Sequence, residues 1–234
     1  MALPKLNSAS YQTTIPSTGQ KVTFRPYLVK EEKVLMIALE SNDQKQIVRA
    51  TEEMISSCIL DDIDVNSLAT FDIESLFLDL RSKSVGESIG LKVKCDQCET
   101  QNDVTVNFDE ISVDVPDENN VIMLTDSVGV EMRYPSFDDV SNIDPDKEQS
   151  IESAFDIIMK CIVSVFDDDG VYTAKNEGPK QMKEFIESLN TQQFQNISAF
   201  FENMPALKSV ISFKCSNCSA ENETELRGLQ SFFT

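Results

Sequence analysis

Apolar residues recur at helical spacing over the first third of the chain, after a polar opening stretch. Three helices are predicted, beginning near Val29, near Asp43 and near Asp72, with Thr70 or Asp72 as the N-cap of the third. Their apolar stripes are Leu28, Leu35, Ala38 and Leu39; Ile47, Ala50, Met54 and Cys58; and Ile73, Leu76, Phe77 and Leu80. The pattern predicts helices over residues 29–84, preceded by an extended N-terminal arm over 1–28 that docks on another surface.

After Gly86 the spacing of apolar residues changes from helical to alternating, the pattern typical of strands. Strands are expected at 91–94, 104–108, 111–115, 121–124 and 130–134. Together they predict a small antiparallel sheet over residues 85–135.

Helical spacing returns over residues 136–206. One helix is expected from about Pro145, with the stripe Ile151, Phe155, Ile158, Cys161, Ile162 and Val165. A second runs from Pro179 to Leu189, and Thr191 caps a third that Pro205 ends. The spacing of Phe194, Phe200 and Phe201 favours core packing over an exposed partner surface. The order predicts an α+β fold, helix-rich, with one globular unit over 29–234.

Two Cys-x-x-Cys pairs lie far apart in the chain, Cys95 with Cys98 and Cys215 with Cys218. Two residues between cysteines let a tight turn direct both sulfurs at one tetrahedral ion, and two such turns complete a shell of four. Both pairs follow a short strand, and both share a preceding lysine and an asparagine four residues after the second cysteine. The spacing predicts a split, zinc-ribbon-like site that holds one structural zinc, with its first half at 85–135 and its second at 207–234.

The sequence gives less support to two other interpretations of these cysteines, disulfide formation and redox chemistry. A disulfide within either pair would strain a short loop, and nothing in the sequence indicates an oxidising compartment. A thioredoxin-like redox pair would open a helix within a βαβ unit, a context that neither pair has. The remaining cysteines, Cys58 and Cys161, fall on apolar helix faces and are expected in the core.

The charge of the chain is strongly acidic, with 40 Asp and Glu against 20 Lys and Arg and a formal net charge of −20. Such a surface repels phosphate backbones and anionic membranes, so nucleic acid is not an expected partner. No apolar run reaches the roughly 20 residues of a membrane-spanning helix. The residues from Met1 to Lys5 lack the features of a signal peptide, which predicts residence in a reducing cytoplasm.

Catalysis is not expected from this composition. The chain has no histidine, so Cys-His and Ser-His-Asp arrangements are excluded. The acidic run Asp167-Asp168-Asp169-Gly170 lacks the alternating ligands and closing glutamate of an EF-hand, and is expected to be a solvated turn. No glycine-rich phosphate loop occurs.

Several stretches resemble the baseplate hub assembly proteins of T-even-type contractile-tailed bacteriophages. These stretches are residues 16–33, Ser84-Val85-Gly86-Glu87, and Phe200-Phe201-Glu202-Asn203-Met204-Pro205. The resemblance implies a chaperone-like assembly factor or minor component of the tail baseplate hub, without catalytic residues. It also implies binding to other hub proteins through residues 25–28 and 30–33.

The expected function is therefore that of a non-enzymatic, zinc-stabilised protein that binds other phage hub or tail proteins during virion assembly. It would act in the host cytoplasm, with the virion baseplate as a second location. A zinc-ribbon regulator that binds transcription or replication machinery is the alternative. The terminal pair Phe232 and Phe233 has two interpretations, burial in the core or binding in a partner's groove.

Overall fold

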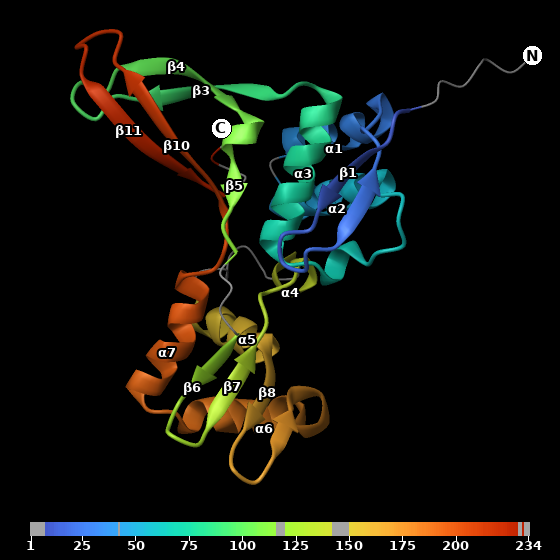
Figure 1. The fold of residues 1–234 in the computed structure, drawn as a ribbon, viewed down its shortest axis with the longest axis vertical. Helices are drawn as coiled ribbons and strands as arrows, with labels where there is room; N and C mark the ends of the chain where they lie inside the picture. Colours follow the sequence, from blue (N-terminus) through green and yellow to red (C-terminus); the bar gives the residue numbers. More distant parts are fainter. Residues whose placement is uncertain (1–7, 42, 116–119, 142–149, 229–230, 232–234) are drawn as a thin grey trace, which may run out of the picture. The chain divides into compact units, whose positions relative to one another are not determined.

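The computed structural model describes residues 8–41, 43–115, 120–141, 150–228 and 231 (Figure 1). The chain divides into two compact units, which we call unit 1 (1–115 with 205–234) and unit 2 (116–204). The helices are α1 (Val29–Ser41), α2 (Gln44–Cys58), α3 (Thr70–Ser84), α4 (Phe137–Ser141), α5 (Ile151–Cys161), α6 (Ala174–Ser188) and α7 (Thr191–Glu202), with short 3-10 turns η1 (Val65–Ser67) and η2 (Phe108–Glu110). The strands are β1 (Tyr11–Thr14), β2 (Lys21–Phe24), β3 (Ser88–Lys94), β4 (Gln101–Asn107), β5 (Ser112–Val113), β6 (Val121–Met123), β7 (Gly129–Met132), β8 (Ile162–Phe166), β9 (Val171–Thr173), β10 (Leu207–Lys214) and β11 (Glu221–Arg227).

The described part of the predicted N-terminal arm is a hairpin that packs within unit 1. Strands β1 and β2 pair antiparallel, and Val22 and Phe24 of β2 are buried. The Thr13 hydroxyl donates to the Asp79 carboxylate of α3 at 2.6 Å. The Ser17 backbone N–H donates to Asp72 of the same helix at 2.8 Å. The surface on which this segment docks is therefore its own chain.

The first three helices lie where their periodicity predicted, but two details differ. Asp72 does not cap α3, because the N-cap is Ala69 and the fully buried Asp72 carboxylate accepts the Ala69 backbone N–H at 3.1 Å. The predicted stripe of α1 is also wrong at its ends. Leu28 and Leu39 are exposed, whereas Glu31 is buried because it pairs with an arginine.

Two β-hairpins form the other part of unit 1. Strands β3 and β4 make one hairpin, β10 and β11 make the second, and β5 pairs with β10. Alternate side chains of these strands point inward, as expected of half-buried antiparallel pairs. Together with Leu78 of α3 and Phe108 of η2 they build a core of seven buried residues, namely Leu78, Leu91, Val106, Phe108, Leu207, Ile211 and Leu226.

Unit 2 contains a four-stranded antiparallel sheet in the order β6-β7-β8-β9. Its core consists of Leu124, Val130, Met132, Ile158, Cys161, Ile162, Val165, Met182, Ile186 and Ile197. Phe194, Phe200 and Phe201 pack against this core partly buried, as the helical spacing predicted.

The predicted helix through Val165 is wrong in its last turn. Helix α5 ends at Cys161, and the residues that follow form strand β8, which pairs with both β7 and β9. The β-branched residues Ile162, Val163 and Val165 favour a strand once partner strands flank the segment on both sides. The single sheet predicted over 85–135 is likewise divided, since β6 and β7 belong to the sheet of unit 2.

The α+β class and the helix-rich content agree with the prediction. The expectation that residues 29–234 form one globular unit remains a prediction, because a division into two compact units does not show whether they fold independently. Among the described residues no helix is both long and apolar enough to span a membrane.

Candidate metal centre

Each cysteine pair lies in the turn at the tip of a hairpin. Cys95 and Cys98 lie between β3 and β4, and Cys215 and Cys218 lie between β10 and β11. In the first tip the Cys95 carbonyl accepts the backbone N–H four residues on at 2.9 Å, and in the second tip the Cys215 carbonyl does so at 3.0 Å. The residue after the second cysteine has a positive φ in both tips, 56° in one and 58° in the other. The same local sequence thus folds into the same turn twice.

The structure brings all four predicted ligands together, with their sulfur atoms within 4.8 Å of one another. Cys95 Sγ lies 3.6 Å from Cys218 Sγ, and Cys98 Sγ lies 3.6 Å from Cys215 Sγ. A tetrahedron with metal–sulfur bonds of about 2.3 Å has sulfur–sulfur edges of about 3.8 Å. The two 3.6 Å distances match such edges, and the remaining sulfur–sulfur distances are at most 4.8 Å, so the cluster is close to the size of a tetrahedral thiolate site. The two 3.6 Å distances are too long for disulfides.

The electrostatics of the cluster also fit a bound cation. The pKa of Cys98 is lowered to about 6 by hydrogen bonds from the Thr100 side chain and backbone. For Cys218 the backbone N–H of Ala220 lowers the pKa, but the neighbouring sulfurs, Cys98 first, outweigh it and raise the pKa to about 12. Four thiolates this close repel one another, so the fully ionised cluster needs a positive ion at its centre.

Further donors surround the sulfurs. The Asn217 backbone N–H donates to Cys215 Sγ at 3.4 Å, and its side-chain amide donates to Cys98 Sγ at 3.7 Å. The side-chain amide of Asn102 donates to Cys215 Sγ at 3.8 Å. These bonds favour the thiolate form and orient the ligands.

Burial is uneven across the site. Cys95 and Cys215 are 1% and 2% exposed, Cys98 is half-buried and Cys218 is exposed. If all four sulfurs bind one ion, they fill a tetrahedral shell and leave no position for substrate or water. Soft thiolate ligands in this geometry suit zinc, which would join the two hairpins when bound.

The comparison with protein families gives one result that bears on identity. The model of the family described as T4 bacteriophage base plate protein matches residues 8–234. The chain belongs to this family. Membership in a baseplate family implies a structural role in the phage tail and contacts with other phage proteins. Searches of curated proteins and of solved structures gave no match to this baseplate protein.

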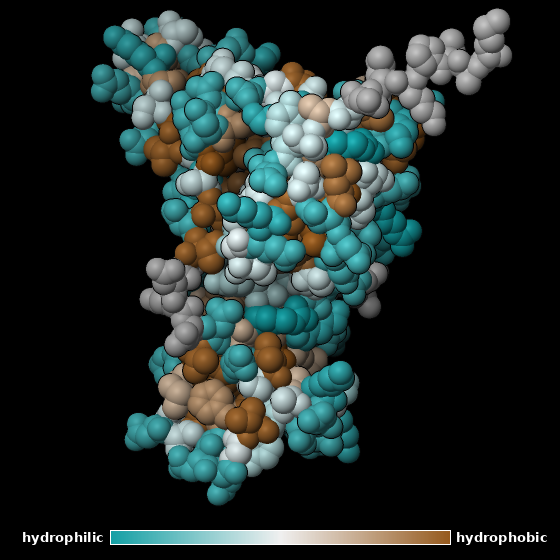
Figure 2. Space-filling view, turned by 45° about the vertical axis from the view of Figure 1, so that its right-hand side comes forward, coloured by the Kyte–Doolittle hydropathy of each residue, from teal (hydrophilic) through white to brown (hydrophobic). Residues whose placement is uncertain are grey.

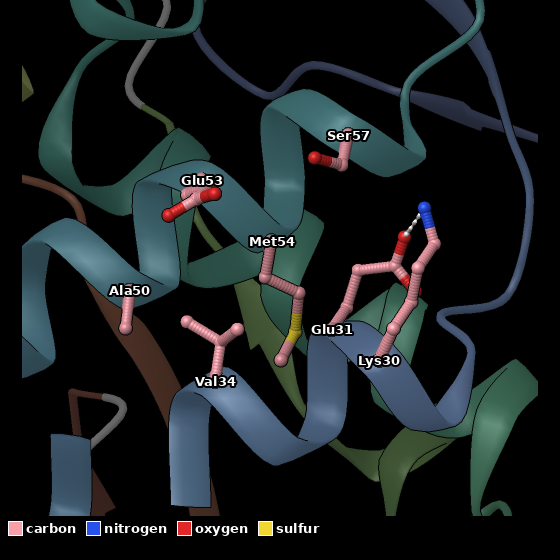
Figure 3. Close-up of a pocket in the computed structure, with 7 residues that line it drawn as sticks. All are labelled: Lys30, Glu31, Val34, Ala50, Glu53, Met54 and Ser57. Atoms are coloured by element: carbon pink, nitrogen blue, oxygen red, sulfur yellow. Dashed lines mark ion pairs between the residues drawn. The ribbon is translucent and has the colours of Figure 1, made fainter. Parts of the chain in front are cut away.

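The baseplate protein has a cavity between α1 and α2, with a volume of about 180 Å³ (Figure 3). It is lined by Lys30, Glu31, Val34, Ala50, Glu53, Met54 and Ser57. Figure 3 shows Lys30 and Glu31 paired at one end, with nitrogen and oxygen 3.1 Å apart. Burial favours the neutral form of Glu31, but hydrogen bonds from Arg25, the Leu28 backbone and Lys30 outweigh it and lower the pKa to about 2. A carboxylate with so low a pKa is a poor general base near neutral pH.

Other sequence predictions are resolved in the same structure. Cys58 and Cys161 are fully buried, and burial raises the pKa of their thiols to about 11 and about 12. Asp167 accepts the Gly170 backbone N–H at 3.0 Å, as expected of a solvated turn between β8 and β9. Phe232 and Phe233 lie outside the described residues.

Sequence reasoning found the four cysteines but gave no role to the asparagine shared by both motifs. Asn102 and Asn222 are each 7% exposed and hydrogen-bonded beside the sulfurs. The signal was present, because the asparagine follows the second cysteine at the same spacing in both motifs.

Proposed function

We propose that this baseplate protein is a non-enzymatic hub component or hub assembly factor that binds other hub or tail proteins during virion assembly. The family match over residues 8–234 carries the proposal. The site of action would be the host cytoplasm during assembly, with the completed baseplate as the destination. The family match does not support the alternative function, a zinc-ribbon regulator.

We further propose that Cys95, Cys98, Cys215 and Cys218 hold one structural zinc ion. The spacing of the four sulfurs and the hydrogen bonds to them support this assignment. Structural zinc stabilises small β regions whose apolar core is limited.

Metal analysis of the purified protein tests the zinc assignment. About one zinc per chain is expected, with loss of hairpin structure when a strong chelator removes it. Iron at the same stoichiometry would replace zinc in the assignment, and protein free of metal with four reactive thiols would refute the metal site.

Helix α1 supplies the proposed contact surface for a partner. Five of its apolar side chains reach solvent: Val29 is 79% exposed, Met36 56%, Ile37 55%, Leu39 51% and Val34 42%. Exposed apolar residues gathered on one helix are typical of protein interaction sites. Figure 2 shows, on the face drawn there, apolar side chains reaching a largely hydrophilic surface in separate patches.

The charge of the chain defines the chemistry of this partner. At a net charge of −20, association is favoured with a hub protein that surrounds an apolar groove with lysine and arginine. The segment implied by the family resemblance contributes only in part. Glu31 binds Arg25 at 2.7 Å and Lys30 at 3.1 Å, which leaves the exposed Leu28 and Lys33 of this segment for a partner.

A pull-down with individually purified hub and tail-tube proteins tests the function. The wild-type chain should retain one of them, and Ile37→Glu should weaken binding at least about tenfold. Val171→Glu is the matched control, because Val171 is an apolar side chain of unit 2 that is 68% exposed. Equal binding by Ile37→Glu would refute the α1 surface, and retention of none of these proteins by the wild type would refute the hub role.

A further inference from the structure

The same contacts occur after a β-hairpin in both halves of the chain. Arg25 directly follows β2, and Arg133 directly follows β7. The Arg25 backbone N–H donates to the carbonyl of Cys58, the last residue of α2, at 2.9 Å. The Arg133 backbone N–H donates to the carbonyl of Cys161, the last residue of α5, at 2.8 Å.

Each of these arginines also binds the carboxylate six residues further on. Arg25 lies 2.7 Å from Glu31, and Arg133 lies 2.5 Å from Asp139. In each pair the acid accepts the backbone N–H three positions before it, at 2.8 Å and 2.9 Å. The same arrangement of an arginine, a carboxylate and a helix C-terminus therefore occurs at equivalent positions in both halves of the chain.

The correspondence continues to the cysteine hairpins. Leu68 and Leu189 precede α3 and α7 with matching backbone angles, φ −70° and ψ 150° for the first, φ −70° and ψ 143° for the second. Strands β3 and β4 follow α3, and β10 and β11 follow α7. The described parts of residues 11–107 and 121–227 thus repeat one module. The second copy carries strands β8 and β9 and the long helix α6 in addition, and in the first copy an isolated bridge between Phe24 and Ile59 lies where β8 pairs with β7.

The repeat makes Asn102 and Asn222 equivalent. Asn102 pairs with Val93 across the first hairpin, and Asn222 pairs with Phe213 across the second, each opposite the residue two before the first cysteine. Both asparagines are buried, so each polar atom of their amides needs a partner.

The Asn102 amide joins the two tips. Its oxygen accepts the Ser216 backbone N–H at 2.8 Å and the Ser216 hydroxyl at 2.9 Å. Its nitrogen donates to the Thr100 carbonyl at 2.8 Å, within its own hairpin.

The Asn222 amide makes the reciprocal contacts. Its oxygen accepts the Asp96 backbone N–H at 3.0 Å, and its nitrogen donates to the Ala220 carbonyl at 2.9 Å. Each asparagine is therefore fixed by its own hairpin and holds the residue that follows the first cysteine of the other hairpin.

We propose that Asn102 and Asn222 are paired positioning residues that hold the two cysteine tips in register, so that four sulfurs from the two copies of the module can bind one metal ion. The role of these amides at the metal rests on the zinc assignment above. The reciprocal hydrogen bonds themselves do not depend on it.

The two tips differ in one contact, and this difference allows a test in which a substitution is expected to strengthen zinc binding. Ser216 donates to Asn102 through both its backbone and its hydroxyl, whereas the contact of Asp96 with Asn222 is through the backbone N–H. Asp96→Ser makes the first tip like the second. It should slow zinc transfer to a competing chelator by about threefold, the effect of one added hydrogen bond.

Loss of either amide should weaken metal binding. Asn102→Ala and Asn222→Ala are each expected to lower zinc affinity about 10–100-fold in chelator competition, and to broaden or shift the thiolate-to-metal charge-transfer bands of the cobalt-substituted protein. Asn107→Ala is the matched control, because Asn107 lies on β4 too but is exposed and bonds Glu110. Its affinity and cobalt spectrum should equal those of the wild type.

We call the reciprocal hydrogen bonds of Asn102 and Asn222 to the opposite tips the clamp. Amide hydrogen exchange in the wild type tests it without a substitution that could prevent folding. Asp96 and Ser216 are exposed residues at turn tips, yet their backbone amides should exchange at least about 100-fold more slowly than an unprotected loop amide. Rapid exchange at both amides would overturn the clamp.

The two proposals fail in different ways. If the wild type holds about one zinc and both alanine variants match it in affinity and spectrum, the positioning role is wrong while the zinc assignment stands. If the wild type holds no metal but the two amides are protected, the zinc assignment is wrong and the clamp is purely structural.

Discussion

The two units stabilise their β-structure by different means. Unit 2 buries a cluster of ten residues beside a single four-stranded sheet. In unit 1, two separate hairpins share a core of seven residues, and their tips meet at four cysteines. Within the described ranges, these cysteines are the one group of three or more side chains placed to hold a metal.

The difference shows what a metal contributes that apolar burial does not. Apolar burial stabilises unit 2 under most solution conditions, whereas thiolate ligation depends on pH, redox state and metal supply. Apart from the buried Cys95 and Cys215, the residues of the hairpin tips are exposed or half-buried, so the tips have few apolar contacts to hold them together. The comparison predicts that changes in pH, redox state and metal supply act on the hairpins of unit 1, whereas a core truncation in unit 2 leaves the metal site intact.

The largest effect is expected from Cys215→Ser. Bound zinc should fall from about one ion per chain to near zero, and the hairpin region should unfold or aggregate, with a melting temperature lowered by more than about 10 °C. Metal analysis and thermal unfolding measure both. Cys161→Ala, a cysteine change in unit 2, should leave the zinc content unchanged, and zinc retention by Cys215→Ser would contradict the four-ligand site.

A core truncation in unit 2 should lower the stability of the protein without changing its zinc content. Ile197 is fully buried in the apolar cluster, so Ile197→Ala should lower the free energy of unfolding by about 2–5 kcal/mol. Denaturant unfolding gives this value, and zinc content should stay at about one ion per chain. Loss of zinc in this variant would show that the two units are energetically coupled.

The buried ion pair of unit 1 adds a pH dependence separate from that of the metal. The pKa of Glu31 is lowered from 4.5 to about 2, so its contribution is fully present above pH 4.5 and is lost as the pH falls towards 2. After allowance for solvent screening, Glu31→Gln should cost about 2 kcal/mol at pH 7. The gap in unfolding free energy between the variant and the wild type should narrow from pH 4.5 downwards. A gap that stays constant would contradict this pairing.

The smallest effect concerns the surface of α6. Lys183 Nζ lies 3.8 Å from Glu187 in an exposed i,i+4 pair. Lys183→Ala should change the unfolding free energy by less than about 0.5 kcal/mol and leave zinc binding unaffected. A cost above 1 kcal/mol in denaturant unfolding would indicate an additional contact of this side chain.

The sequence predicted those features that depend on residues close together in the chain. Helices α2 and α3 follow from apolar spacing, and the cysteine tips follow from a motif that folds within a few residues. Pro179 was expected at the start of a helix, and the structure has a break at Gly178, with φ 82°, directly before it.

Features that depend on distant partners were missed. Ile162 and Val165 fit a helical stripe, but β7 and β9 on either side make them a strand. Asp72 looks like an N-cap, yet the β1–β2 turn supplies Ser17 as its partner and draws it into the core. The repeated module escaped detection because sequence identity is confined to isolated positions, such as Arg25 with Arg133 and Cys58 with Cys161.

The separation of the two cysteine pairs has a consequence for the order of synthesis. The first hairpin emerges from the ribosome well before the second, because Cys98 and Cys215 are separated by the whole of unit 2. A chain interrupted between Cys98 and Cys218 would hold two or three of the four ligand thiols and no closed shell. Completion of the metal centre would thus report that unit 2 has already been translated, and it would separate truncated chains from those competent to enter a baseplate.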